Sequence, residues 1–436
     1  MTAATTDQTR IELTRLRRAG FDPWLLASTV ALVCLGLVMV ISASIGQSFV
    51  DGQNYLEKEG LFICAGLCAM GLGAWLKYET WKRFSTAIAA GTGLLLVLVL
   101  MPHIGASSNG AQRWFSFHGW DFEPSEMAKI ALAIYFAHWL SKKGDRIRGW
   151  LACTFPFGLM LGIVCILILK QPDMGTAVVL ALSMVVVYFV AGAQIQHLLA
   201  GIVGGLAMAA IGVGAEGYRM NRIRVWEDPF KYAKGPGYHI VQVLIALGRG
   251  GLFGVGPGNS QQKFLLPAPS TDSIFAVTAE ELGFIGATLI IGLFVLLAYR
   301  GIKIAVDAPD DFGRLLAVAI TTTIVLQAFV NIAVITNTVP FTGVPLPFIS
   351  YGGSSLIVCM FSVGILLNIS RESRRRVRPP KPDSDTEGRP KDAHRHHRRQ
   401  DRRPRLSGTG GRRVPAPALV HSQSVGGPTR GARHYG

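Results

Sequence analysis

Residues 24–44, WLLASTVALVCLGLVMVISAS, form an uncharged apolar run of 21 residues. This length matches the roughly 20 residues that an α-helix needs to cross a bilayer. Nine further apolar runs follow, at about residues 60–76, 85–102, 125–140, 150–169, 175–191, 198–214, 283–299, 315–335 and 348–369. The pattern predicts an all-α integral membrane protein with about ten transmembrane helices.

The composition supports this class. Half of the 436 residues are hydrophobic, 16% are charged and the mean hydropathy is +0.36, which fits an integral membrane protein better than a soluble one. The predicted organisation is an N-terminal segment (residues 1–21), a polytopic membrane domain (22–370) and a C-terminal tail (371–436). An even number of spans places both termini on one side. The basic sequences QTRIELTRLRR (8–18) and RESRRRVR (371–378) indicate that this side is cytoplasmic.

The C-terminal tail carries most of the positive charge. Residues 371–436 hold 18 Lys and Arg against 6 Asp and Glu, which is 12 of the 16 net positive charges of the chain. Its Pro, Gly, Ser and Arg content predicts disorder. No aromatic residues alternate with the arginines, so a nucleic-acid partner is not expected. Anionic membrane lipids or an acidic partner are the simpler ligands.

A large polar loop, residues 218–283, separates the predicted seventh and eighth helices on the extracytoplasmic side. Its cations lie outside, against the usual cytoplasmic bias, which suggests an anionic ligand such as phosphate or pyrophosphate. The candidate ligands are Arg219, Arg222 and Lys263. The stretch YHIVQVLIALGRGGLFGVGPG (238–258) predicts a short amphipathic or re-entrant helix broken by glycines.

Ionisable residues at or inside the spans are costly and are therefore candidates for a site. Glu126 and Lys129 lie three residues apart at the start of the predicted fourth helix, close enough to neutralise each other. A structural ion pair and a substrate contact are equally compatible with this spacing. Glu280 and Glu281 follow Asp272 by eight and nine residues. They cannot both share its face of an unbroken helix, and at least one is expected to form structural hydrogen bonds.

Two further motifs lie at the mouths of spans. NGAQRW (109–114) predicts a turn that leads into an interfacial aromatic belt, with Arg113 placed to meet lipid phosphates and therefore a candidate substrate contact. VPFTGVPLPFISYGGSS (339–355) gathers prolines, glycines and serines at the start of the last span. Interrupted helix ends of this kind commonly mark binding sites, in transporters as well as in enzymes. The candidate substrate contacts here are Ser350, Gly352 and Gly353.

Several of these motifs together resemble the SEDS family, the FtsW/RodA polymerases of bacterial peptidoglycan. The motifs are NGAQRW (109–114), EPSEMAK (123–129), QPDMGTA (171–177), GVGPGNSQQKFLLPAPSTDSIFAVTAEELG (254–283) and GVPLPFISYGGSS (343–355). They occur in the family's order and cover nearly all of residues 22–376, excluding the tail. GLVMVISAS (36–44) and ISYGGSS (349–355) are more similar to the cell-division branch than to the elongation branch.

The resemblance implies a ten-helix glycosyltransferase of the bacterial inner membrane that polymerises lipid II into glycan strands on the outer face, at the division septum. The family's essential aspartate corresponds to Asp272, which would act as general base on the acceptor sugar. Arg219, Arg222 and Lys263 would offset the charge of the leaving undecaprenyl pyrophosphate. A divalent cation, Mg²⁺ or Mn²⁺, could share that task. The implied partners are a class B penicillin-binding protein, which is a transpeptidase, and other division proteins.

The chain departs from the family's pattern at three positions near this site. Ser273 stands where the family usually has Phe, Ser270 where His is frequent, and Glu123 where Gln usually precedes the Pro-Ser-Glu sequence. None of these departures removes the expected base. They leave the surroundings of Asp272, and any metal ligands there, unspecified.

Two other functions remain compatible with the sequence. A lipid II flippase would also need intramembrane charges and cationic loops, but it has no need for a single aspartate at the outer mouth of a span. A noncatalytic division scaffold would suit the basic tail, but it leaves the polar loop unexplained.

Overall fold

The computed structural model describes residues 20–51, 54–102, 104–108, 111–117, 120–197, 199, 201 and 217–376. Almost all of the expected N-terminal segment and most of the expected basic tail lie outside these residues. The expected seventh span, residues 198–214, also lies outside them apart from two positions. The last helix continues to Arg376, beyond the expected start of the tail at residue 371.

Each of the other nine apolar runs coincides with a helix. Six of the described helices are long and apolar enough to cross a membrane. The helices at the nine runs are α2 (Pro23–Asp51), α3 (Tyr55–Trp75), α4 (Tyr78–Val99), α5 (Pro124–Ser141), α6 (Phe155–Lys170, preceded by the π-helical turn η2, Trp150–Thr154), α7 (Met174–Val190), α11 (Ile274–Val306), α12 (Asp311–Ile335) and α13 (Gly353–Arg376). The prediction of a helical, multi-span membrane protein is confirmed.

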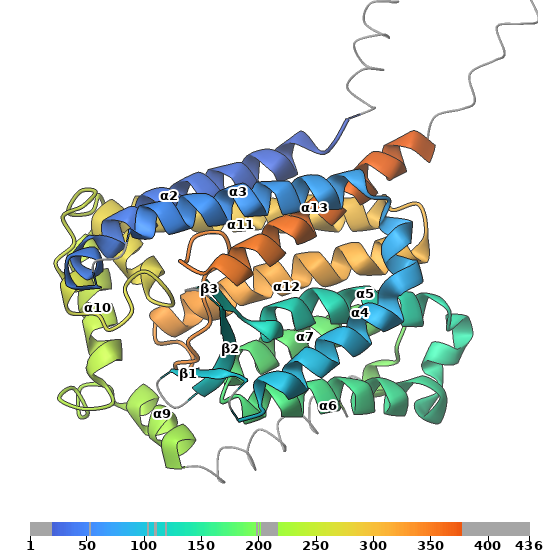
Figure 1. The fold of residues 1–436 in the computed structure, drawn as a ribbon, viewed down its shortest axis with the longest axis horizontal. Helices are drawn as coiled ribbons and strands as arrows, with labels where there is room; N and C mark the ends of the chain where they lie inside the picture. The colour runs from blue at the N-terminus through green and yellow to red at the C-terminus, as the bar shows by residue number, and fades with distance from the viewer. Residues whose placement is uncertain are drawn as a thin grey trace, which may run out of the picture. The chain divides into compact units, whose positions relative to one another are not determined.

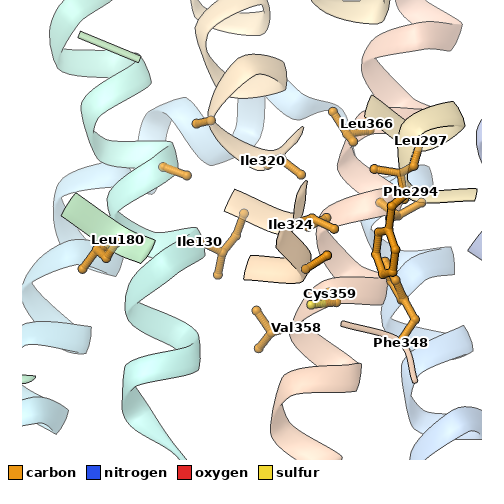
Figure 2. Close-up of a cluster of buried hydrophobic side chains, with 14 of the residues drawn as sticks. Ile130, Leu180, Phe294, Leu297, Ile320, Ile324, Phe348, Val358, Cys359 and Leu366 are labelled. Atoms are coloured by element: carbon orange, nitrogen blue, oxygen red, sulfur yellow. The ribbon is translucent and has the colours of Figure 1, made fainter. Parts of the chain in front are cut away.

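The helices pack side by side (Figure 1), and a buried apolar core joins them. α12 contacts α5 and α7 on one side and α11 and α13 on the other. Figure 2 shows the side chains that fill this region, which come from five helices and from the segment before α13. The labelled members are Ile130, Leu180, Phe294, Leu297, Ile320, Ile324, Phe348, Val358, Cys359 and Leu366. This packing holds the C-terminal end of α12 beside the segments that carry the candidate site.

A small antiparallel sheet follows α4, where the sequence predicted a turn. It consists of β1 (Ala106–Ser108), β2 (Ala111–Phe117) and β3 (Trp120–Phe122), in the order β1-β2-β3. Trp114 pairs with Ala106, and Phe115 pairs with Phe122. The predicted turn at NGAQRW is therefore wrong for residues 111–114. The aromatic residues of AQRWFSF favour a strand, which the expected interfacial belt obscured.

The large loop contains two helices, α9 (Gly217–Glu227) and α10 (Tyr238–Gly250), and the short 3₁₀ helix η3 (Gln262–Phe264). A short helix was predicted at α10, whereas α9 was not predicted as a helix. α10 packs against α11 through its buried face, which includes Ile240, Val243 and Ala246. Glycines end the helix as predicted, since Gly251 adopts a φ of 51°.

The chain after α10 is joined to a break in α11. Gly283 interrupts α11 with φ 68° and ψ −167°. The peptide nitrogen of Val255 donates to the carbonyl of Glu280 (3.0 Å), and that of Phe284 donates to the carbonyl of Gly251 (2.9 Å). An added Cβ at Gly283 would lie 2.3 Å from the nitrogen of Gly254. Only glycine fits this contact.

Gly283→Ala is expected to destabilise the protein strongly. The backbone conformation alone would cost on the order of 1–3 kcal/mol, and the contact with Gly254 adds to that cost. Gly292→Ala, in the same helix, is the matched control, because an added Cβ there meets no atom within 4 Å. Thermal unfolding in detergent should show a large drop in midpoint for the first variant and none for the second. Equal midpoints would contradict the close packing at Gly283.

Candidate functional site

Asp272 lies in the turn that precedes α11. Asn331 of α12 fixes this turn, because its side-chain amide donates to the carbonyl of Asp272 (2.9 Å) and to that of Val344 (2.7 Å). Asn331 is buried. One side chain thus joins the Asp272 turn to residues 336–352, the segment between α12 and α13, which we call the 336–352 loop.

Asp272 is half-buried at this junction. Thr271 Oγ1 donates to Asp272 Oδ1 (3.2 Å). The 336–352 loop passes beside the other oxygen, since a Cβ built at Gly343 would lie 3.7 Å from Asp272 Oδ2. Burial raises the pKa of Asp272, while the charge of His239, the Thr271 hydroxyl and the charge of Arg222 oppose that rise. A carboxylate with a raised pKa is a better proton acceptor than an ordinary aspartate.

Two side chains of the large loop, Arg222 and His239, reach the same region. Arg222 of α9 donates to the carbonyl of Phe341 (2.8 Å), and its guanidinium lies 5.4 Å from the centre of the Phe341 ring. His239 of α10 packs against the same ring, with centroids 4.6 Å apart. Burial lowers the pKa of His239, and the charge of Asp272 opposes this. These contacts bring Arg222 and His239 together at Phe341, and both act electrostatically on Asp272.

His239 was not predicted as a site residue, because it lies inside an apolar pattern that is typical of a helix. Its ring nitrogen Nε2 lies 2.9 Å from Ser273 Oγ, and Ser273 is fully buried. Ser273 is one of the departures from the family's pattern, and a Phe there could not form this hydrogen bond. The departure at Ser273 indicated that the surroundings of Asp272 differ from those usual in the family. It did not indicate that His239 is the partner of Ser273. Arg219 lies in α9 three residues before Arg222, and the structure places it no further.

Lys263 is not an exposed cation, which corrects the expectation that it faces a ligand. Its side chain is buried, and Nζ lies 2.7 Å from the carbonyl of Gly258, 3.4 Å from Ser42 Oγ of α2 and 3.5 Å from Glu281 Oε1. Glu281 also accepts hydrogen bonds from Ser42 Oγ (2.6 Å) and the nitrogen of Gly258 (2.9 Å). These contacts tie the large loop to α2 and α11.

Glu280 forms the second half of this arrangement. It is fully buried, and Arg249 Nε lies 3.3 Å from its Oε1. The backbone nitrogens of Gln261 and Gln262 donate to its two oxygens, each at 3.3 Å. Both glutamates therefore form structural hydrogen bonds, as the sequence predicted for at least one. The break at Gly283 was not foreseen.

The Glu126 and Lys129 pair is buried between α5 and α12. Lys129 Nζ donates to Glu126 Oε1 (2.7 Å) and to Gln327 Oε1 (2.6 Å), and Gln327 Nε2 donates to the carbonyl of Pro345 (3.0 Å). A cavity of about 20 Å³ adjoins the pair. This geometry supports the structural ion pair.

Arg113 does not point to lipid phosphates, so that prediction is wrong. Its guanidinium donates to the carbonyls of Gln171 (2.8 Å) and Pro172 and lies 4.0 Å from the carboxylate of Asp173. Asp173 in turn accepts from the nitrogen of Thr176 and caps α7. Arg113 thus fixes the connection between α6 and α7.

The residues of ISYGGSS shape the 336–352 loop and its junction with α13. Ser350 is buried, and its hydroxyl accepts from the nitrogen of Leu346 (2.7 Å). The carbonyl of Gly352 accepts from Leu356 (3.0 Å), and Gly353 packs tightly on the ring of Phe62. The nitrogen of Tyr351 donates to the carbonyl of Ser270 (2.8 Å), which joins this motif to the Asp272 turn. The hydroxyl of Ser350 is therefore used within the loop, where it stabilises the turn.

Metal ligands are sparse around the site. Among the residues that the structure describes, no three His, Cys, Asp or Glu side chains gather in a group that could hold an ion. Asp272 and His239 supply one carboxylate and one imidazole at the site, which is too few ligands to enclose a cation. A protein cage for Mg²⁺ or Mn²⁺ is therefore not formed by the described residues.

Comparison with known proteins agrees with the sequence motifs. Residues 23–375 match the "Cell cycle protein" model of FtsW, RodA and SpoVE. A probable peptidoglycan glycosyltransferase FtsW of Geobacter sp. (strain M18) is 42% identical over 82% of this chain and 99% of its own length. Stage V sporulation protein E of Bacillus subtilis shows the same identity and coverage.

Solved structures show the same fold. A chain of a peptidoglycan synthase complex that coordinates polymerisation and crosslinking aligns with TM-score 0.69 and 28% identity, over 81% of this chain and 98% of that one. The rod shape determining protein RodA of Thermus thermophilus aligns with TM-score 0.60 and 29% identity, over 81% and 97%. The chain is a multi-pass membrane protein, and it belongs to the cell cycle protein family of FtsW, RodA and SpoVE.

Proposed function

We propose that this protein is a peptidoglycan glycosyltransferase that polymerises lipid II, the undecaprenyl-pyrophosphate-linked disaccharide pentapeptide, during cell division. The activity for which its FtsW relatives are named supports this function. The observation that carries it is the position of Asp272. Asp272 is half-buried and lies in the turn before α11, Asn331 holds its backbone carbonyl, and the charges of His239 and Arg222 act on its carboxylate.

The proposed chemistry is one displacement at an anomeric carbon. Asp272 accepts the proton of the acceptor sugar's 4-hydroxyl as that oxygen attacks the anomeric carbon of the donor. The bond from this carbon to the pyrophosphate oxygen breaks, and undecaprenyl pyrophosphate leaves with the electron pair. Arg222, with Arg219 on the same helix, offsets the charge that develops on the leaving group. Lys263 holds the loop in this scheme and does not bind the pyrophosphate.

The electrostatics of this site predict a shift in the pH profile of Arg222→Gln. The Arg222 charge stabilises the ionised carboxylate, so its loss raises the pKa of Asp272 further. Because the base must be ionised, the acidic limb of the pH profile of the polymerisation rate should move to higher pH. Arg224→Gln, exposed on the same helix, is the control and should leave the limb unchanged. If the acidic limb of Arg222→Gln stays at the same pH, the charge of Arg222 does not influence the ionisation of the catalytic base.

A divalent cation and a partner enzyme complete the proposal. Since the described residues form no cage, any Mg²⁺ or Mn²⁺ would be bound mainly by the pyrophosphate and water, as is usual for Mg²⁺. No step of the displacement depends on it. We expect a class B penicillin-binding protein to crosslink the strands, in line with the synthase complex that this chain resembles. We place the protein in the bacterial plasma membrane at the septum, with both termini in the cytoplasm.

A direct assay tests the function. The purified protein should be incubated with lipid II, with and without a class B transpeptidase, and the products separated on a gel. A ladder of glycan strands is the expected result. Intact lipid II in every lane, with a partner shown to bind, would exclude the polymerase. It would leave the flippase and the scaffold as the remaining functions.

A further inference from the structure

The segment between α10 and α11 exposes large apolar side chains. Leu252 and Phe253, just after α10, are 64% and 80% exposed. Phe264 and Leu265, in η3 and just after it, are 63% and 48% exposed. We call these four residues the apolar patch. In water such a surface would be unfavourable by roughly 25 cal/mol for each Å² of apolar area, so it needs an occupant.

One half of the patch, Leu252 and Phe253, adjoins the exposed face of a membrane helix. The nitrogen of Phe284 donates to the carbonyl of Gly251 (2.9 Å), and that of Ile285 donates to the carbonyl of Leu252 (3.2 Å). Phe284 and Ile285 are themselves 65% and 55% exposed on α11. In a membrane protein, the exposed apolar face of a spanning helix contacts acyl chains. Leu252 and Phe253 therefore adjoin a surface that already faces lipid.

Charge in this segment, all of whose residues the structure describes, is neutralised within the protein. Between residues 240 and 271 the charged side chains are Arg249 and Lys263. Arg249 lies 3.3 Å from Glu280, and Lys263 lies 3.5 Å from Glu281. Both glutamates are buried under the segment. Internal pairing of this kind removes the main obstacle to entering the hydrocarbon region.

Backbone polar groups are satisfied in the same way. The nitrogens of Val255 and Gly256 donate to the carbonyls of Glu280 and Glu281, both at 3.0 Å. The break at Gly283 frees these two carbonyls, so the segment and the helix complete each other's hydrogen bonds. Irregular backbone at membrane depth requires this kind of internal pairing.

We propose that the apolar patch inserts into the acyl-chain region of the outer leaflet and sets the height of Asp272 above it. An α-helix rises about 1.5 Å per residue, so the eleven residues from Asp272 to Gly283 separate the carboxylate from the break beside the patch by roughly 16 Å along the axis of α11. That is the zone of lipid headgroups and of sugars attached to them. The role of this height in presenting the sugar to Asp272 rests on the proposed function. The insertion of the patch into the membrane does not.

Depth-dependent quenching tests the insertion without using activity. The six native cysteines are replaced by serine, and a single Phe253→Cys variant is labelled with an environment-sensitive fluorophore and reconstituted into phosphatidylglycerol vesicles. Phe230→Cys is the matched control, since Phe230 is 66% exposed in the same large loop, and no hydrogen bond joins it to α11 within the described part of the chain. Doxyl lipids and a water-soluble quencher are then applied to both.

The expected result is strong quenching at position 253 by a doxyl group near the top of the acyl chain, and protection from the water-soluble quencher. Position 230 should show the opposite pattern. If the aqueous quencher reaches the label at position 253 as readily as the label at position 230, the proposal is wrong. The patch would then be a binding surface for a protein partner that the vesicles lack. Because no substrate is present, this outcome is distinct from failure of the polymerase function.

Discussion

Asp272→Asn is expected to lower the rate of lipid II polymerisation by roughly 10²–10⁴-fold, the contribution typical of a general base. Asparagine has nearly the same shape but cannot accept the proton of the attacking hydroxyl. The backbone carbonyl of residue 272 keeps its hydrogen bond from Asn331, so the turn should retain its position. The rate is measured from the accumulation of glycan strands under substrate saturation.

The control for this variant is Asp228→Asn. Asp228 is an exposed acid of the same large loop, and its carboxylate accepts a hydrogen bond from the nitrogen of Lys231 (3.2 Å). It should polymerise at the normal rate. Thermal unfolding of Asp272→Asn should match that of the unmodified protein. A variant at Asp272 that folds normally and polymerises at the normal rate would remove this residue from the chemistry.

Lys129→Met is expected to destabilise the membrane domain by about 3–5 kcal/mol, because it leaves Glu126 as an uncompensated buried charge. Lys129 is 4% exposed and Glu126 is 1% exposed. Lys129 also supplies a hydrogen bond to Gln327, which in turn holds the carbonyl of Pro345 in the 336–352 loop. The loss should therefore lower the unfolding midpoint in detergent and also reduce activity.

The double variant Glu126→Leu/Lys129→Met separates structure from substrate binding. Removing both charges should restore most of the stability, since apolar replacement of a buried pair is often neutral or stabilising. Lys142→Met, an exposed lysine at the end of α5, is the control and should have no effect on the midpoint. A single Lys129→Met variant of normal stability but raised KM would instead show that Lys129 contacts the substrate.

Much of the fold could be predicted from hydropathy, because each span must be apolar over a length that the bilayer fixes. The strand at Arg113 could not, because a seven-residue polar and aromatic segment carries no comparable signal. The tertiary roles of single cations were also hidden. Arg113, Lys129 and Lys263 look alike in sequence, yet each is held by a carboxylate or carbonyl that only the folded chain brings near.

Asp272 and Arg222, at the centre of the candidate site, were predicted from motifs and charge and not from hydropathy. Asp272 was identified from its motif, and Arg222 from its place in a cationic loop. His239 gave no signal because its partner Ser273 is far from it in sequence and its neighbours are apolar. Similarly, the hydrogen bonds of Glu280 and Glu281 to the large loop depend on the break at Gly283. A glycine inside an apolar helix does not by itself predict such a break.

The most direct test of a polymerase centred on Asp272 presents lipid II to the reconstituted protein only in the leaflet that the large loop faces. The unmodified protein, with its transpeptidase partner, should convert this lipid II into glycan strands, and Asp272→Asn should not. Equal strands from both proteins, or movement of lipid II to the other leaflet without any strands, would contradict a polymerase that uses Asp272 as its base.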